Sequence, residues 1–116
     1  MFNTFISFYL KDNKVHVFTE TLHALGDPKR ICFMLDQEGN RLLMLPYTKK
    51  DFVSHSVPDA VYRGNDSMEV NSKKLCWMLA EQHGWDPSRS FRVPGVVLAE
   101  KQLAAFDLTR AEMIGN

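Results

Sequence analysis

Apolar residues occur along this chain in short runs that polar turns separate. The runs are rich in Phe, Ile, Val and Leu, and several alternate with polar residues, a pattern typical of buried or half-buried β-strands. The pattern predicts strands over residues 3–10, 15–18, 30–35, 41–45, 67–71, 90–93 and 103–108.

Polar segments between these runs predict where strands turn or stop. Residues 11–14 and 36–40 are short enough to close hairpins, and the second contains Gly and Asn, which tolerate positive φ. Pro46 has no amide hydrogen to donate, so we expect it to end the preceding strand. Pro94-Gly95 is expected to interrupt the strand that starts at residue 90, and residues 96–98 either extend it or form a turn.

A short helix is predicted after the second strand. Thr19 is its expected N-cap, because a hydroxyl there can accept a bond from a free backbone amide. Glu20 follows in the first turn, where the helix dipole favours an anion. Leu22 and Leu25 share a face, and Gly26 begins a stop signal that a proline completes.

A longer helix is predicted in the second half. Ser72 is the expected N-cap, apolar residues from Leu75 onward follow helical spacing, and Gly84 ends the helix. Trp85 then fits a hydrophobic contact that closes the last helical turn. Residues 109–114 are expected to form a terminal helical turn.

Residues 46–66 are polar and contain two prolines, which sets the segment 48–66 apart from the rest of the chain. We interpret it as a linker, or as a loop that crosses one end of the domain. Tyr47, Phe52 and Tyr62 lie in or beside it, and exposed aromatic residues often anchor a protein partner. The alternative is that these side chains pack the loop onto the domain.

The two halves of the chain resemble each other. Residues 3–47 and 67–114 each contain a strand, a capped helix, a Gly-ended turn and two more strands. Such a β-α-β-β unit cannot bury its strands alone, whereas two units can cover each other. We therefore predict one α+β domain over residues 1–116, a small barrel-like sheet of two repeats. Chance similarity is the alternative, because Gly and Asp-Pro are ordinary helix stop signals.

Composition narrows the class of protein. With 116 residues, 45% hydrophobic and 24% charged, the chain can form one globular domain rather than a disordered segment. Fourteen basic and fourteen acidic residues give zero net charge, which removes bulk cationic attraction to nucleic acid or membranes. No apolar run is long enough for a membrane helix, and no basic region opens a secretory signal. Cys32 and Cys76 have apolar neighbours, so we expect buried, reduced thiols in a cytoplasmic protein.

Residues 14–26, which read KVHVFTETLHALG, and the hairpin at 30–46 resemble the AbrB-like swapped-hairpin family. The resemblance implies a small barrel of two interlocked repeats and a DNA-binding role. The family's opening turn carries Gly-Arg where this chain has Asn13-Lys14, and proline precedes its helix where this chain has Phe18-Thr19. His23 stands at a usually basic position. These departures fall on DNA-contacting positions.

A Lys/Arg face is the candidate nucleic-acid site. In a swapped-hairpin barrel, turns and helix starts from both halves can converge and meet phosphates. The alternative is that the lysines are solvated and that the two arginines pair locally with Asp27 and Asp86. The candidate DNA-binding residues are Lys11, Lys14, Arg30, Lys73, Lys74 and Arg89.

The sequence contains no clear motif for a catalytic site or a metal-binding site. The histidines at 16, 23, 55 and 83 show no ligand spacing, and the chain has no Cys-x-x-Cys and no Gly-rich phosphate loop. Cys76 and His83 are about 10 Å apart along a helix, too far for a nucleophile and its base. Ser54-His55 lacks a supporting carboxylate. We expect no enzyme activity, metal or cofactor.

Two functions follow. The first is a small DNA-binding regulatory protein. The alternative is a protein-interaction module or inhibitor, such as a phage or other mobile genetic element carries, without DNA binding. A small-molecule pocket is a third class that no residue set specifies. The protein is expected to be either a pseudo-dimeric monomer or a homodimer.

Overall fold

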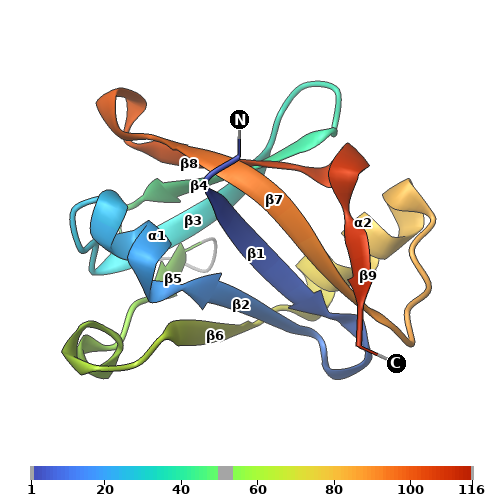
Figure 1. The fold of residues 1–116 in the computed structure, drawn as a ribbon, viewed down its shortest axis with the longest axis horizontal. Helices are drawn as coiled ribbons and strands as arrows, with labels where there is room; N and C mark the ends of the chain where they lie inside the picture. The colour runs from blue at the N-terminus through green and yellow to red at the C-terminus, as the bar shows by residue number, and fades with distance from the viewer. Residues whose placement is uncertain (1, 50–53, 116) are drawn as a thin grey trace.

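The structure is a computed structural model that describes residues 2–49 and 54–115. These residues form a sheet of short antiparallel strands that curls into a nearly closed barrel, with a helix at each end (Figure 1). The strands are β1 (Thr4–Tyr9), β2 (Lys14–Phe18), β3 (Arg30–Leu35), β4 (Arg41–Pro46), β5 (Ser54–Ser56), β6 (Ser67–Asn71), β7 (Ser90–Leu98), β8 (Leu103–Asp107) and β9 (Glu112–Ile114). The helices are α1 (Thr19–Ala24) and α2 (Lys73–His83), and single 3-10 turns are η1 (Leu10–Asp12), η2 (Asp59–Arg63), η3 (Ala99–Lys101) and η4 (Leu108–Arg110).

The strand order around the barrel is β5-β3-β4-β8-β7-β1-β2-β6, and β9 adds to β7 outside this path. Because β5 and β6 do not pair, a seam remains between them. The two predicted hairpins are confirmed: β1 pairs with β2 and β3 pairs with β4, both antiparallel. The fold is therefore mostly β, a small eight-stranded barrel with two helices, which bears out the barrel-like sheet expected from the apolar runs.

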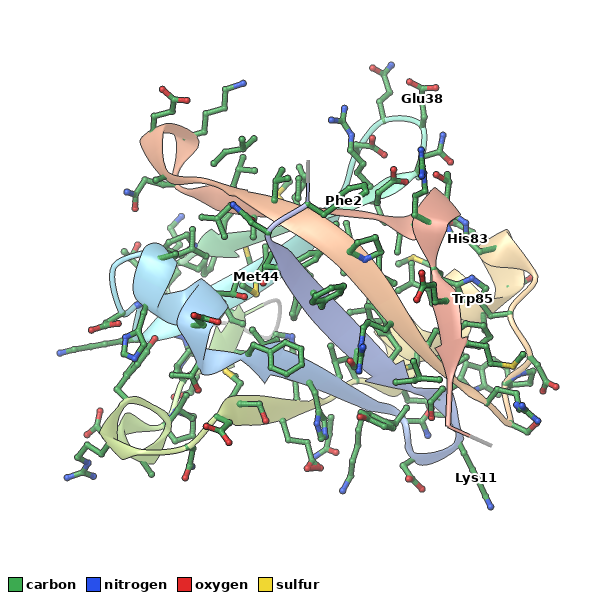
Figure 2. The ribbon with its side chains drawn as sticks, viewed as in Figure 1. Phe2, Lys11, Glu38, Met44, His83 and Trp85 are labelled. Carbon is green, nitrogen blue, oxygen red and sulfur yellow. The ribbon has the colours of Figure 1, made fainter. Side chains whose placement is uncertain are left out.

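The core fills the barrel with side chains from alternate strand positions, as period-two patterning requires. Each helix adds one fully buried leucine, Leu22 from α1 and Leu79 from α2, so the helices close the two ends. Figure 2 shows Met44 inside and Lys11 projecting outward. The fully buried strand residues include Ile6, Phe8, Val15, Ile31, Leu42, Met44, Val93, Ala104 and Phe106.

The boundaries of α2 confirm the local sequence signals. The Ser72 hydroxyl accepts a bond from the Leu75 amide at 3.2 Å, and Gly84 takes the left-handed conformation with φ of 66°. The Trp85 amide donates to the Ala80 carbonyl at 3.0 Å. The Trp85 ring then stacks on the ring of Phe91 with centroids 4.9 Å apart, which fixes the chain leaving the helix.

The predicted cap of the first helix is wrong. Phe18 is the N-cap residue and Thr19 is already helical and buried. The Thr19 hydroxyl donates instead to the carbonyl of Asn65 at 2.8 Å. A tertiary partner on the loop before β6 has therefore taken the hydroxyl that the local pattern assigned to the helix.

The segment 48–66 is not a mere linker. Its described part forms β5, which pairs with the edge of β3, and the 3-10 turn η2. Val57 and Val61 from this segment are buried in the core. Three residues of β5 carry no strand pattern of their own, so only the free edge of β3 makes them a strand.

Strand β7 runs without a break through Pro94-Gly95, against the prediction. One edge of β7 pairs with β1 along its first part. The other edge changes partner, because β9 pairs as far as Arg92 and β8 pairs from Gly95. On this edge Pro94 lies between the residues that pair with β9 and those that pair with β8. Its missing amide hydrogen therefore removes no hydrogen bond from either pairing.

The chain end also differs from the prediction. Only residues 108–110 form a helical turn, η4, and residues 112–114 form β9 instead of continuing it. Strand β9 pairs with the start of β7, with Met113 opposite Phe91. Strand β8 leaves the start of β7 without a partner on this edge, which explains why this short segment is extended.

Corresponding strands of the two halves lie side by side. Strand β2 pairs with β6, with Val15 opposite Val70, and β4 pairs with β8, with Leu42 opposite Phe106. Both halves run strand, helix, strand, strand in the same order. The two halves thus share one barrel and one core rather than forming separate units.

Candidate functional site

The start of α2 and the turn η1 lie together at one end of the barrel. The Ser72 amide donates to the Asn13 carbonyl at 2.9 Å, and Lys14 is paired with Asn71 across β2 and β6. This packing gathers four of the six predicted phosphate-contacting residues at one end. We call them the lysine cluster: Lys11, Lys14, Lys73 and Lys74.

The members of the lysine cluster differ in how free their charge is. Lys14 Nζ lies 2.7 Å from Glu69 Oε1, and this hydrogen-bonded contact raises the pKa of Lys14 and lowers the pKa of Glu69. In the described parts of the chain, Lys11, Lys73 and Lys74 have no carboxylate within ion-pair distance. Three exposed charges thus remain available to an external anion.

The helix start adds to the positive potential. No acidic residue stands in the first turn of α2, and the helix dipole places partial positive charge there. Lys73 and Lys74 therefore oppose the dipole at a cost of a few tenths of a kcal/mol each. A phosphate bound at this place would relieve that repulsion.

The two arginines do not join the lysine cluster. Arg30 begins β3, and its Nε donates to the Ser54 hydroxyl at 2.9 Å. Arg89 lies beyond the other end of α2, where its backbone amide donates to the Asp86 carbonyl. Arg89 Nε is buried and has no hydrogen-bond partner among the described residues.

The alternative of local arginine–aspartate pairs is not seen either. Asp27 binds His23 Nδ1 at 2.5 Å rather than Arg30. Asp86 accepts bonds from the amide and hydroxyl of Ser88, which lower the pKa of Asp86, with a smaller through-space contribution from Arg89. The turn after each helix is therefore held by short-range partners of the aspartate.

Tyr62 packs on the barrel. Its ring lies 5.5 Å from that of His23, and its hydroxyl donates to the Pro28 carbonyl at 2.6 Å. Burial raises the pKa of Tyr62 to about 12. The structure thus uses this side chain to attach η2 to the α1–β3 connection.

The other two predicted partner-binding aromatics lie elsewhere. Tyr47 follows β4, and its amide donates to the Arg30 carbonyl at 2.9 Å. It lines a hollow of about 490 Å³ with Pro28, Pro46 and the start of β3. Phe52 lies outside the residues that the structure describes.

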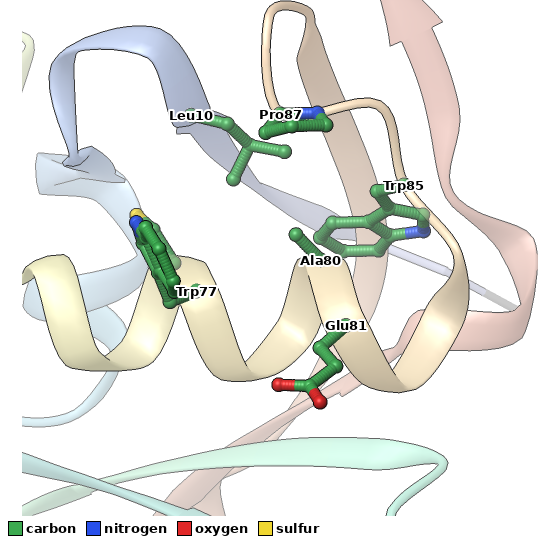
Figure 3. Close-up of a pocket in the computed structure, with 7 residues that line it drawn as sticks. Leu10, Trp77, Ala80, Glu81, Trp85 and Pro87 are labelled. Carbon is green, nitrogen blue, oxygen red and sulfur yellow. The ribbon is translucent and has the colours of Figure 1, made fainter.

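One exposed feature was not predicted as a site. Trp77 on α2 is 64% exposed, more than any other large apolar side chain described. It borders a groove of about 400 Å³ between α2, η1 and the turn at 85–87 (Figure 3). Leu75 and Leu79 point inward on the same helix, so helical spacing alone indicates that Trp77 faces outward. The groove residues are Leu10, Cys76, Trp77, Ala80, Glu81, Trp85 and Pro87.

Burial and spacing decide what the cysteines and the possible metal ligands among the described residues can do. Cys32 and Cys76 are both buried, and burial raises the pKa of Cys76 to about 11, which keeps it a thiol. No three His, Cys, Asp or Glu side chains within residues 2–49 and 54–115 converge as metal ligands. None of the helices described there has the length and apolarity needed to cross a bilayer.

Comparison of the chain with protein-family models, with curated proteins and with solved structures finds no match.

Proposed function

We propose that this protein is a small cytoplasmic DNA-binding regulator that contacts backbone phosphates with the lysine cluster. The observation that carries the proposal is the convergence of residues 11, 14, 73 and 74, from η1, β2 and α2, on one end of the barrel. Phosphate contacts from lysines and a helix start fix the orientation of a protein on a duplex.

The pairing of equivalent strands within the barrel supports a fold made of two repeats. We infer two AbrB-like β-α-β-β repeats within one chain, because equivalent strands pair with each other, β2 with β6 and β4 with β8. A swapped-hairpin dimer built from two chains would bring equivalent strands together around its two-fold axis in the same way. The chain would then be a pseudo-dimer.

Charge sets how strongly such a protein can bind. The chain has zero net charge, and Glu69 neutralises Lys14, so only three lysines contribute fully. The logarithm of the affinity for a duplex falls linearly with the logarithm of the salt concentration, and the slope is proportional to the number of phosphates neutralised. We therefore expect weak binding with a shallow salt slope, equivalent to about three phosphates.

The experiment is fluorescence anisotropy of short duplex DNA at low and at physiological salt. The double variant Lys11→Ala/Lys74→Ala should weaken binding at low salt and flatten the salt slope by about two phosphates. The matched control Lys101→Ala/Arg110→Ala removes two exposed charges from η3 and η4 and should leave binding unchanged. Absence of binding at low salt, or equal loss in both double variants, would overturn the proposal.

A protein-interaction module or inhibitor, as a mobile genetic element would carry, is the second candidate. The hollow beside Tyr47 favours it, because an aromatic ring and two prolines border a volume of about 490 Å³. Aromatic residues beside a concave surface are typical anchors for a protein partner. Loss of a co-purifying protein on Tyr47→Ala, with DNA binding absent, would select this candidate.

A further inference from the structure

The outward face of α2 carries a cation, an aromatic ring and an anion at regular intervals. Lys73, Trp77 and Glu81 are four residues apart, so they share one side of the helix. All three are exposed, and Lys73 Nζ lies 5.6 Å from the centroid of the Trp77 ring. We call these three residues the α2 stripe.

An apolar groove runs beside the α2 stripe. Leu10, Ala80, Trp85 and Pro87 form its walls, and Glu81 stands at its rim (Figure 3). In the described residues Glu81 has no cation within ion-pair distance. An exposed tryptophan next to an apolar hollow leaves apolar surface in water, and such a surface is typical of one that a partner covers. The carboxylate of Glu81 is solvated there and is available to pair with a cation of the partner.

The order of charges on the α2 stripe is self-complementary. Trp77 stands midway between Lys73 and Glu81. When two such helices pack antiparallel about a two-fold axis at Trp77, each Lys73 lies opposite the other copy's Glu81. The same contact then occurs twice, as an isologous interface requires.

We propose that two copies of this chain associate through the α2 stripes, each Trp77 entering the groove of the other copy. This goes beyond the DNA-binding proposal and does not depend on it. The two proposals share Lys73, so a dimer that pairs Lys73 with Glu81 leaves Lys11 and Lys74 as the unpaired lysines of the lysine cluster in the described residues. The groove volume of about 400 Å³ is large enough for an aromatic side chain. The two charge pairs set the antiparallel orientation, and the tryptophans supply the buried apolar area.

The size of the contact sets the affinity. Helix α2 has 11 residues, so it is only about 16 Å long. An interface based on one such helix from each copy is at the small end of specific interfaces, and we expect a reversible dimer that dissociates on dilution.

Sedimentation equilibrium over a range of concentrations tests the proposal. The wild-type chain should show a concentration-dependent monomer–dimer equilibrium, and Trp77→Ala should abolish it. Lys73→Glu and Glu81→Lys should each weaken association on the order of tenfold, because each places like charges opposite each other twice. These side chains are exposed, and circular dichroism with thermal unfolding checks that each variant keeps the fold.

The decisive experiment mixes the two charge-reversed variants, Lys73→Glu and Glu81→Lys. In the mixed dimer every residue at 73 again faces an opposite charge at 81, so association should return. Mixing Lys101→Glu with Glu100→Lys creates the same difference in net charge on η3 and should leave the mixture no more associated than its separate components. This control separates paired contacts from general attraction between oppositely charged proteins.

A wild-type chain that stays monomeric up to about 0.5 mM would overturn the proposal. So would a dimer that Trp77→Ala leaves intact, or charge-reversed variants that fail to associate when mixed. A monomer that binds an unrelated peptide in the groove would assign the α2 stripe to a different occupant and would equally contradict self-association.

Discussion

Gly95 lies so close to Phe106 that a Cβ built on it would be 2.5 Å from the ring carbon Cδ1 of Phe106. The two residues are opposite each other where β7 meets β8. Phe106 is fully buried in the barrel, and the same Cβ would also be 2.5 Å from the Ala105 carbonyl oxygen. The absence of a side chain at residue 95 therefore lets the two strands approach and the ring fill the core.

Gly95→Ala should lower the free energy of unfolding by about 1–3 kcal/mol, because overpacking forces a ring or a strand to move. Urea unfolding followed by circular dichroism measures the loss. In a Phe106→Leu background the same substitution should cost less, although the backbone carbonyl still opposes it. An unchanged unfolding midpoint for Gly95→Ala would contradict the close approach.

Ser72→Ala should destabilise the protein by about 1 kcal/mol, because the Leu75 amide loses the hydroxyl that accepts its bond. Ser72→Asp retains an acceptor at the same place and should keep most of the stability. Thermal unfolding of the two variants compares them directly. Equal losses for alanine and aspartate would show that the hydroxyl does not cap α2.

Tyr62→Phe should cost about 1 kcal/mol, because the Pro28 carbonyl loses its donor at 2.6 Å. Burial raises the pKa of Tyr62 to about 12, so this tyrosine should stay un-ionised near pH 10 in the native protein. Absorbance titration of wild type and variant identifies it. A variant whose titration curve differs from that of wild type by a phenol that ionises near pH 10 would contradict the assignment.

Acidification should weaken the fold through His55. Burial and the nearby Arg30 charge lower the pKa of His55 below its ordinary value of 6.5. The unfolded chain then binds a proton more readily than the native one, so this contribution is complete above the ordinary pKa and is lost as the pH falls below it.

His55→Gln should therefore reduce the drop in unfolding free energy between pH 7.5 and about pH 5. Denaturant unfolding at the two pH values, for wild type and variant, gives the comparison. The ring of Phe33 lies 5.7 Å from that of His55, so some pH-independent loss is also expected. A variant with an unchanged pH dependence would rule out His55 as its source.

Elements with local causes were predicted from the sequence. Strand β3 follows from its continuous apolar run and strand β6 from its apolar alternation. Ser72 and Gly84 bound α2 because capping needs only residues within one turn. The lysines of the candidate site were also identified locally. That these lysines lie together at one end of the molecule could be expected only by assuming the barrel fold.

Elements with distant causes were missed. Strands β5 and β9 exist because β3 and β7 offer free edges far along the chain. The hydroxyl of Thr19 donates to the carbonyl of Asn65, which is 46 residues away along the chain. Helix-capping rules consider only residues within the first turn, so they could not predict this bond. Arg30 and Arg89, equivalent in sequence, were expected beside the lysines, yet neither joins the lysine cluster.

The sequence by itself determined the period-two strands, both hairpins and the ends of α2, because each depends on neighbours a few residues apart. The tertiary structure alone decided which edges found a partner and how closely Gly95 approaches Phe106. It also decided that Trp77 borders a groove and that, within residues 2–49 and 54–115, three lysines have no carboxylate within ion-pair distance. Each of these features involves contacts between segments that are far apart in the sequence. Such segments meet only when the barrel closes, so residues near each other in the sequence cannot indicate them.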